Sequence, residues 1–254
     1  MIVGIIPARF ASTRLMGKPL ADIGGKPLIQ HTYESACKSK LLNKVVLAVD
    51  DEKVAETAQN FGAEVFLTPK DINTGSDRIA MVAKELKDAK IIVNIQGDEP
   101  FIRGTMIDQA IEPLLFDKAV NVSTLAKRIE TVTELNSPGI VKVVFDYNNF
   151  ALYFSRSPIP YVRDAISDES AISRAEIYKH IGLYVYRKDW LLKFTQLEQT
   201  DLEKAEKLEQ LRMLENGFKI KIVITEYESV GVDTPEDLNR ARAYYNWLKK
   251  KEGE

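Results

Sequence analysis

IVGIIPARFASTRLMGKPL, residues 2–20, is the stretch of this 254-residue chain that decides the fold. It begins with an unbroken apolar run, residues 2–6, which Pro7 ends. An apolar run without polar alternation predicts a β-strand buried on both faces, as in a parallel sheet covered by helices. A loop rich in small and cationic residues follows at once. Loops that leave the carboxyl end of a strand are where open α/β sheets bind ligands.

The same alternation of strand and helix continues to about residue 120. Apolar runs predict further strands at 44–49, 64–67 and 91–95. Amphipathic patterns predict helices at 27–38, 51–61, 76–86 and 104–115. Strands and helices that alternate with short connections predict a parallel sheet covered by helices.

Beyond about residue 120 the pattern changes to strands with little helix between them. Strands are predicted at 120–126, 141–145, 151–155, 179–187 and 219–225, and a charged helix at 201–215. Asp146-Tyr147-Asn148-Asn149 predicts a hairpin turn, and residues 157–173 are expected to be irregular. Thr234-Pro235-Glu236-Asp237 has the capping pattern that opens a last helix. The chain is therefore predicted to be one α/β domain with a mixed-sheet insertion.

Composition bounds the class of protein. The chain is 45% apolar and 28% charged with a net charge of -2, which is ordinary for a globular protein and argues against a nucleic-acid binder. Its single cysteine, Cys37, cannot form an intrachain disulfide, which fits a reducing compartment. No apolar run approaches the roughly 18 residues of a membrane helix, and the N-terminus lacks the features of a signal peptide. We expect a cytosolic protein with neither a membrane nor a nucleic acid as partner.

Several familiar site motifs are missing from the sequence. It contains no GxGxxG, GxxxxGK[ST], GxSxG or HExxH pattern. Its two histidines, His31 and His180, cannot build a histidine-based zinc site. The usual P-loop, dinucleotide-binding, serine-hydrolase and zinc-enzyme interpretations are therefore disfavoured.

Three charged clusters remain as candidates for chemistry. Arg9, Arg14 and Lys18 follow the first strand, where cations and small residues suit a polyphosphate; the alternative is a solvated basic loop. Asp98, in Gln96-Gly97-Asp98-Glu99-Pro100, follows the strand at 91–95 and could bind Mg²⁺; the alternative is an ordinary turn. Asp233 precedes the last helix and could be a second ligand or only a turn residue beside the helix cap.

The combination of motifs identifies a family. PARFASTRLMGKPL, NTGSDR, QGDEP, VKVVFD, ALYFSRSPIPY, KHIGLYVYR, LEQLRMLENG and GVDTPEDL occur in order. The chain closely resembles the 3-deoxy-D-manno-octulosonate (Kdo) cytidylyltransferases, which make the activated sugar acid CMP-Kdo for lipopolysaccharide. The resemblance covers residues 2–242. The first loop indicates only the wider sugar-nucleotidyltransferase group, whereas YFSRSPIP, HIGLY and LEQLR narrow it to this sugar acid. Met16 departs from the family, whose loop often has proline there.

The resemblance implies a fold and an organisation. The fold is a Rossmann-like α/β sandwich of the nucleotide-diphospho-sugar transferase type, with a mixed-sheet insertion. The single domain, 1–254, would have a nucleotide-binding part (about 1–119), a sugar-site and dimerisation part (about 120–225) and a metal-ligand turn with the C-terminal helix (226–254). A homodimer is implied, with CTP and Kdo as substrates and Mg²⁺ as cofactor.

The resemblance also implies residue roles. Catalysis would rest on Lys18, Arg14, Asp98 and Asp233, of which the two aspartates would hold Mg²⁺. CTP would be bound by Ala8, Arg9, Ala11, Thr74, Gly75, Ser76 and Arg78. The sugar acid would be bound by Gln96, Arg156, His180, Tyr184, Glu209 and Gln210. The anomeric hydroxyl would attack the α-phosphorus of CTP in line and release pyrophosphate, with no covalent enzyme intermediate.

The sugar pocket carries two further expectations. His180 and Tyr184 are four apart on one predicted strand, which would place them on the same face about 13 Å apart, with room for a sugar between them. Arg156 is expected to supply charge for the sugar carboxylate; the alternative is an ion pair with an acidic residue across the hairpin. Two other functions stay open, a cytidylyltransferase for another acidic sugar (8-amino-Kdo or a sialic-type acid) and a non-catalytic CTP-binding protein.

Overall fold

The computed structural model describes residues 1–11, 14–72 and 74–252, and the chain divides into two compact units. Unit 1 comprises Met1–Asp108 and Ser229–Glu254, and unit 2 is Gln109–Glu228. The resemblance implied a single domain whose parts meet near residues 119 and 225. The motif positions Ser12, Thr13 and Asn73 lie outside the described residues.

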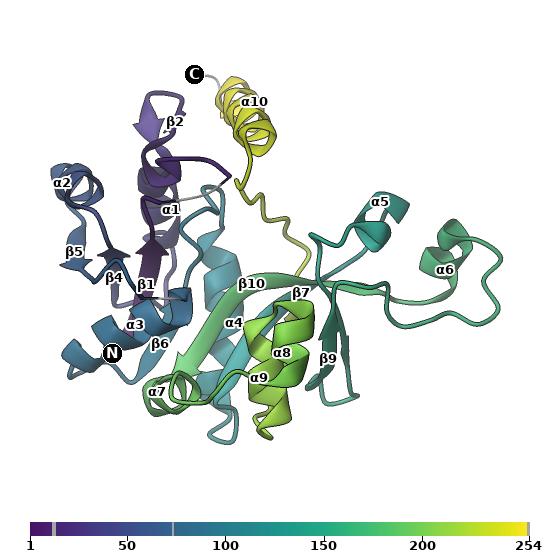
Figure 1. The fold of residues 1–254 in the computed structure, drawn as a ribbon. Coiled ribbons are helices and arrows are strands. Elements are labelled where there is room, and N and C mark those ends of the chain that lie inside the picture. The colour runs from purple at the N-terminus through teal and green to yellow at the C-terminus, as the bar shows by residue number, and fades with distance from the viewer. Residues whose placement is uncertain (12–13, 73, 253–254) are drawn as a thin grey trace. The chain divides into compact units, whose positions relative to one another are not determined.

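Unit 1 is built on a four-stranded parallel sheet. Its strand order is β6 (Ile91–Asn94), β1 (Ile2–Ala8), β4 (Lys44–Val49) and β5 (Glu64–Leu67). Its helices are α1 (Leu28–Ala36), α2 (Glu52–Asn60), α3 (Gly75–Glu85) and α10 (Pro235–Glu252), as Figure 1 shows. A 3₁₀ turn, η1 (Lys18–Leu20), and a short hairpin, β2 (Asp22–Ile23) with β3 (Lys26–Pro27), lie between β1 and α1. Ile5, Leu47 and Ile92 are fully buried in the sheet, which confirms the prediction of buried parallel strands.

The loops after β1, β4 and β6 leave the same edge of this sheet because the three strands are parallel. The loop after β6 passes close to β1 at Gly97. A Cβ atom on Gly97 would lie 2.5 Å from the backbone oxygen of Pro7, so only glycine fits there. This close approach brings Asp98, the next residue, to the loop that follows β1.

Side-chain caps fix the start of two helices of unit 1, of which only the cap of the last helix was predicted from the sequence. Thr74 caps α3 by accepting a hydrogen bond from the backbone N–H of Asp77. At α10 the Thr234 hydroxyl accepts from the N–H of Asp237, and the Asp237 carboxylate accepts from the N–H of Thr234. The capping pattern predicted for the last helix is thereby confirmed, and Asp233 is held immediately before a well-defined helix start.

Unit 2 is built on a mixed sheet. The core strand β7 (Val122–Arg128) is parallel to β11 (Ile220–Ile224) and antiparallel to β10 (Tyr178–Arg187), and β10 pairs with β8 (Lys142–Phe145). β8 and β9 (Ala151–Ser155) form the predicted hairpin, in which Asn149 has a φ of 57°. Its helices are α5 (Val132–Asn136), α6 (Asp168–Arg174), α7 (Lys188–Phe194), α8 (Asp201–Glu206) and α9 (Glu209–Glu215). Helix α4 (Gly104–Phe116) carries the chain from unit 1 into unit 2.

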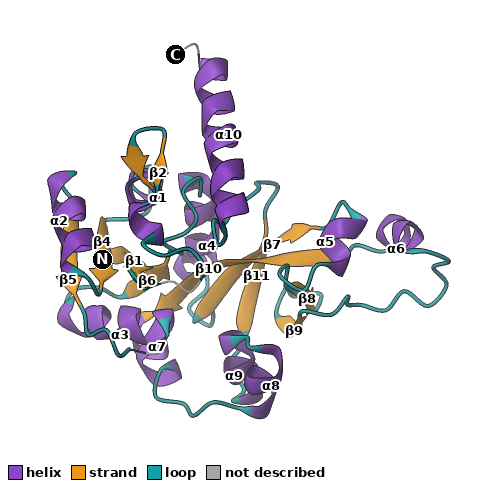
Figure 2. Cartoon of the chain, turned by 45° about the horizontal axis from the view of Figure 1, so that its top comes forward, coloured by secondary structure: helices purple, strands orange, loops and turns teal. Residues whose placement is uncertain are grey.

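Three features of unit 2 differ from the sequence-based expectation. The helix predicted at 201–215 is two helices, α8 and α9, because Lys207 adopts a left-handed conformation with a φ of 55° that ends α8. The segment expected to be irregular contains α6, capped by Ser167 and carried on a long excursion of the chain between β9 and β10 (Figure 1). Helices α5 and α7 were not expected and are visible in Figure 2. Helices α5, α6 and α7 are each shorter than the roughly 10 residues over which a periodic pattern predicts a helix securely.

Among the described residues, no helix combines the length and the apolar character needed to cross a membrane.

Candidate active site

A cavity of about 410 Å³ in unit 1 gathers most of the residues predicted for the nucleotide side. The loops after β1 and β6, the start of α3 and the turn before α10 all contribute to its wall. Its lining includes the predicted residues Ala8, Arg9, Ala11, Arg14, Lys18, Gly75, Gln96, Asp98 and Asp233, together with Pro7, Pro19 and Gly97. Gln96, expected with the sugar-binding group, lies here beside Asp98.

Lys18 connects the two carboxylates of this cavity. Its Nζ donates to Asp98 Oδ2 at 2.7 Å and to Asp233 Oδ1 at 2.9 Å. Burial alone would lower the pKa of Lys18, but the two aspartates raise it above its ordinary value. Lys18 therefore stays charged at neutral pH. Because one ammonium reaches both carboxylates, Asp98 and Asp233 lie close together although 135 residues separate them in the sequence.

A small apolar cluster holds the three loops that carry these charges. Leu15, Phe101 and Val232 each lie within three residues of a site residue, and they pack with Ile23, Leu28, Leu238 and Ala241. The N–H of Val232 donates to the backbone oxygen of Asp98 at 2.9 Å. Apolar burial and this backbone hydrogen bond therefore fix the relative positions of Arg14, Asp98 and Asp233.

The donor set of Asp98 and Asp233 fits a magnesium ion. Two adjacent carboxylates offer the oxygen ligands that Mg²⁺ prefers, and Mg²⁺ usually takes its remaining ligands from water and phosphate. No group of three or more His, Cys, Asp or Glu side chains that could hold a metal occurs among the residues that the structure describes. Asp98 and Asp233 would supply two of the oxygen ligands of such an ion.

The cationic side of the cavity suits a polyphosphate. Arg14 lies 3.3 Å from Asp233 through its guanidinium group and is largely exposed. The Nη2 atom of Arg9 is buried and makes no hydrogen bond with any described residue. A buried guanidinium nitrogen without a partner costs free energy unless a ligand supplies an acceptor. Arg9 therefore points to an anionic ligand.

Arg78 does not line the cavity, although it was predicted to border the nucleotide. It is fully buried and donates to Asp50 Oδ2 at 3.1 Å, to the Thr68 hydroxyl and to the Pro69 carbonyl. The other carboxylate oxygen of Asp50 accepts the N–H of Phe10 at 2.9 Å. Arg78 thus supports the loop after β1 through Asp50. Thr74 and Ser76 are likewise outside the cavity lining, and their contact with a nucleotide stays a prediction.

Asp50 is a residue that the sequence analysis missed. It follows β4 directly, just as the candidate loops follow β1 and β6. A carboxylate at the carboxyl end of a central strand was the signal that could have identified it.

The sugar-side residues His180 and Tyr184 lie in unit 2, where their predicted spacing is wrong. The centres of their rings are 5.3 Å apart, not about 13 Å. Strand β10 contains a bulge: Ile181 is opposite Leu125 and Tyr184 is opposite the neighbouring Thr124. Three steps along β10 therefore match one step along β7, which shortens the strand and brings the two rings into contact. No sugar fits between them, because the rings are in contact and Tyr184 is buried.

Arg156 was expected either to supply charge for the sugar carboxylate or to form an ion pair across the hairpin. Its observed contacts differ from both expectations. Its guanidinium donates to three backbone oxygens, those of Glu206 at 2.7 Å, Pro138 at 2.8 Å and Lys207 at 3.4 Å. Within the described part of the chain it forms no ion pair across the hairpin. The Glu206 carboxylate accepts the backbone N–H of Arg156 at 2.9 Å, and the attraction of the guanidinium for a substrate carboxylate stays a prediction. The structure also gives it a second role, because it binds carbonyl groups at the end of α8.

Glu209 and Gln210 begin helix α9. Gln210 is buried. Burial raises the pKa of Tyr184 well above its ordinary value, and the charge of Glu209 raises it further. Tyr184 is therefore a protonated phenol at neutral pH. The Tyr184 hydroxyl lies near Thr124 but makes no hydrogen bond of good geometry with any described residue.

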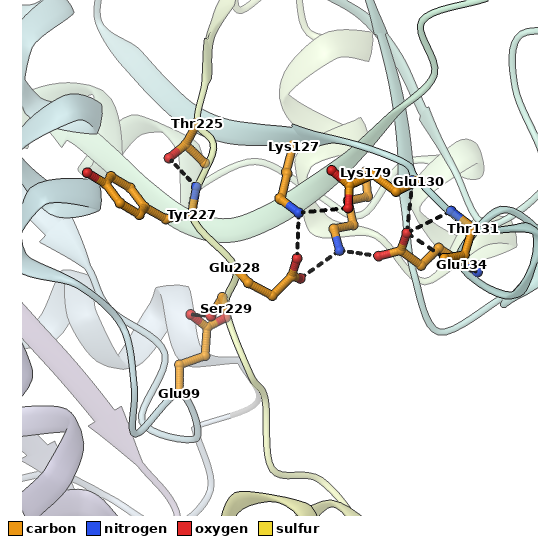
Figure 3. A network of polar contacts seen from close by, with 10 residues as sticks. All are labelled: Glu99, Lys127, Glu130, Thr131, Glu134, Lys179, Thr225, Tyr227, Glu228 and Ser229. Carbon is orange, nitrogen blue, oxygen red and sulfur yellow. Dashed lines mark hydrogen bonds and ion pairs between the residues drawn. The ribbon is translucent and has the colours of Figure 1, made fainter. Parts of the chain in front are cut away.

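A charged network in unit 2 was also missed by the sequence analysis (Figure 3). Lys127 and Lys179 are directly opposite each other on β7 and β10, and both donate to the carboxylate of Glu228, at 2.8 and 2.6 Å. Lys179 also pairs with Glu134. In unit 1 the next residue, Ser229, donates to Glu99 at 2.7 Å. The segment that leads to Asp233 is thus held at both of these residues.

Comparison with known proteins identifies the class. The family model described as "Cytidylyltransferase" matches residues 3–222, so the chain is a nucleotidyltransferase of the cytidylyltransferase class. The 3-deoxy-manno-octulosonate cytidylyltransferase of Geotalea uraniireducens is 54% identical over 243 residues, which cover 94% of this chain and 96% of that protein. The protein of the same name from Geobacter sulfurreducens is also 54% identical, with 94% and 97% covered.

A solved structure agrees with the sequence matches. It is titled as a CMP:2-keto-3-deoxy-manno-octonic acid synthetase complexed with CTP, and it superimposes with a TM-score of 0.90 at 41% identity, over 97% of this chain and 99% of that one. The chain belongs to the 3-deoxy-manno-octulosonate cytidylyltransferase family. The predicted α/β nucleotidyltransferase fold with a mixed sheet is confirmed.

Proposed function

We propose that the protein transfers the cytidylyl group of CTP to 3-deoxy-D-manno-octulosonate, giving CMP-Kdo and pyrophosphate for lipopolysaccharide synthesis. The observation that carries the proposal is the contact of Lys18 with both Asp98 and Asp233 in a cavity walled by Arg9 and Arg14. Membership of the family supports the choice of CTP and of this sugar acid. A cytosolic homodimer belongs to the same proposal, on the resemblance alone.

The reaction needs positioning and charge neutralisation more than covalent chemistry. The anomeric oxygen of the sugar forms a bond to the α-phosphorus, the bond from that phosphorus to the β-phosphate oxygen breaks, and the hydroxyl proton passes to solvent. Asp98 and Asp233 would hold Mg²⁺, which supplies neutralisation of phosphate charge when bound. Arg9 and Arg14 bind the triphosphate.

Lys18 has a particular task in this scheme. Its raised pKa keeps it cationic throughout the neutral range, so it can stabilise the negative charge that develops on pyrophosphate as it leaves. A fixed charge that meets developing charge acts on the transition state more than on the bound substrate.

The sugar half of the reaction is assigned to Gln96, Arg156, His180, Tyr184, Glu209 and Gln210. Arg156 carries a guanidinium charge that pairs only with backbone carbonyl groups among the described residues, which suits the carboxylate of a sugar acid. His180, which is half-buried, is the member of this pair proposed to contact sugar hydroxyls, with the buried ring of Tyr184 packed against it.

The substrate is tested by measuring pyrophosphate release from CTP with Kdo, 8-amino-Kdo and a sialic acid, each with and without Mg²⁺. We expect release with Kdo that depends on Mg²⁺. Preference for another acid would establish the sister activity that the sequence left open. Binding of CTP without release for any acid would establish a non-catalytic protein.

The role of Lys18 is tested by Lys18→Ala, with Lys26→Ala as a matched control. Lys26 pairs with Glu34 in the same unit but lies outside the cavity. We expect Lys18→Ala to lower kcat at least 100-fold with a smaller change in the KM for CTP, and Lys26→Ala to change neither. A raised KM with unchanged kcat would mean that Lys18 only binds substrate.

A further inference from the structure

Thr124, in the middle of β7, makes an unusual set of contacts with the bulge of β10. Its side chain is fully buried. The hydroxyl oxygen Oγ1 lies 2.8 Å from the carbonyl oxygen of Leu183, 3.1 Å from that of Ile181 and 2.9 Å from Nε2 of His180. Ile181 is the last paired residue before the bulge and Leu183 lies within it, so a single hydroxyl contacts the backbone at the start of the bulge and inside it.

Counting protons at this hydroxyl decides the state of His180. Carbonyl oxygens only accept hydrogen bonds, so the one proton of Thr124 is directed to Leu183 or shared with Ile181. The remaining contact, to His180, can then be satisfied only if Nε2 carries a proton and donates it to Oγ1. His180 is therefore the Nε2–H tautomer, and its Nδ1 atom is an acceptor.

The surroundings of His180 keep this ring neutral. The rings of Phe154 and Tyr184 lie 5.1 and 5.3 Å from it, centre to centre, and burial lowers the pKa of His180 to about 3. Nδ1 makes no hydrogen bond with another described residue, and His180 as a residue is half-buried. A neutral imidazole that presents a bare nitrogen accepts a hydrogen bond from a hydroxyl and has no attraction for a carboxylate.

We propose that Thr124 is a positioning residue of the sugar site, which fixes His180 as the Nε2–H tautomer so that Nδ1 accepts a hydrogen bond from a sugar hydroxyl. The inference rests on the proposed function in taking the ligand to be a sugar acid. It follows that His180 binds a hydroxyl of the sugar acid, and that another residue binds the carboxylate. Thr124 reaches the substrate only through His180.

The tautomer can be observed directly because the chain has only two histidines. The ¹⁵N shifts of the imidazole nitrogens distinguish a protonated from a bare nitrogen, and His31→Gln assigns the signals. In the wild type we expect protonated Nε2 and bare Nδ1 for His180. Thr124→Val keeps the branched shape and removes the hydroxyl, so it should produce a mixture of tautomers, whereas Thr124→Ser should restore the wild-type spectrum. A bare Nε2 in the wild type, or an unchanged spectrum in Thr124→Val, would overturn the inference.

Kinetics test the consequence for the substrate. Thr124→Val should raise the KM for the sugar about tenfold, the loss of about one hydrogen bond, while the KM for CTP stays within twofold. Thr124→Ser should rescue the sugar KM. Thr225→Val is the matched control, because Thr225 is also buried in unit 2 and donates to Gln109 at 2.9 Å, away from His180. It should leave the tautomer and both KM values unchanged.

The outcomes separate this inference from the proposed function. A changed tautomer in Thr124→Val with an unchanged sugar KM would remove His180 from the sugar site and overturn the inference. Equal increases in both KM values, matched by Thr225→Val, would show that Thr124 only stabilises the sheet. Failure of every sugar acid to release pyrophosphate would refute the proposed function, and the spectra would still decide whether Thr124 sets the tautomer.

Discussion

The buried ion pair between Arg78 and Asp50 should be among the most sensitive contacts in unit 1. Arg78 is fully buried and Asp50 is 7% exposed, so both charges have been removed from water. Replacing one partner leaves the other as an uncompensated buried charge, which typically costs about 3–5 kcal/mol. We therefore expect Arg78→Met and Asp50→Ala each to lower the free energy of unfolding by about that amount. Asp50→Ala also frees the N–H of Phe10 and should be the worse of the two.

The double variant distinguishes an ion pair from two independent effects. With both charges gone, neither carries an uncompensated desolvation penalty, so the loss should fall short of the sum of the single losses by roughly 2–3 kcal/mol. The measurement is equilibrium unfolding in urea. Lys44→Ala is the control, because its pair with Glu64 links two strands of the same sheet at the surface and should contribute less than about 1 kcal/mol.

The same pair should affect the nucleotide site through the loop after β1. Asp50→Ala should raise the KM for CTP because Phe10 is no longer held, whereas Lys44→Ala should not. Single losses that add up in the double variant, or that are no larger than the loss for Lys44→Ala, would refute the reasoning.

Three further predictions follow from the site. Asp98→Asn and Asp233→Asn should each remove most turnover with little change in melting temperature, and the double variant should be no slower than the slower single one; near-normal turnover in either would refute a shared metal site. Gly97→Ala should destabilise the fold by about 1–3 kcal/mol and slow turnover, because its Cβ would lie 2.5 Å from a backbone oxygen of β1. Gly139→Ala is the control and should do neither, because the nearest atom to its Cβ would be 3.6 Å away. Equal stabilities of the two variants would show that the loop moves freely. The pKa of His180 falls to about 3 on folding, so the unfolded chain binds more protons than the folded chain between pH 6.5 and 3. The contribution of His180 to the free energy of unfolding is therefore unaffected by pH above 6.5 and becomes increasingly unfavourable as the pH falls from 6.5 to 3. Unfolding at pH 7.5 and 5.0 should show a loss about 2 kcal/mol larger for the wild type than for His180→Gln, and equal losses would mean that the ring is solvated.

The main strands and helices of unit 1 could be predicted from local pattern, whereas the turn η1 and the hairpin of β2 and β3 were not predicted. The strands at 44–49 and 64–67 are found with the predicted bounds, and the cap at Thr234 is formed as expected. Buried parallel strands and capped helices are specified by nearby residues, so their signals survive in any tertiary context. The division of the predicted helix at Lys207 was not predictable in this way, because a lysine in the left-handed conformation has no local signal.

The residue types of the site could be predicted from the sequence, whereas the contacts between them could not. The motifs and their order along the chain were sufficient to name the family, with YFSRSPIP, HIGLY and LEQLR narrowing it to the sugar acid, and the cations after the first strand and the aspartates of two distant turns indicated a nucleotide site. That Lys18 joins Asp98 to Asp233, that Arg78 is a buried support for the loop, and that His180 touches Tyr184 were decided by packing across the sheet. A bulge changes the register of a whole strand, and an ion pair forms between residues far apart in sequence. Such distances depend on long-range packing of the folded chain, and no local pattern contains them.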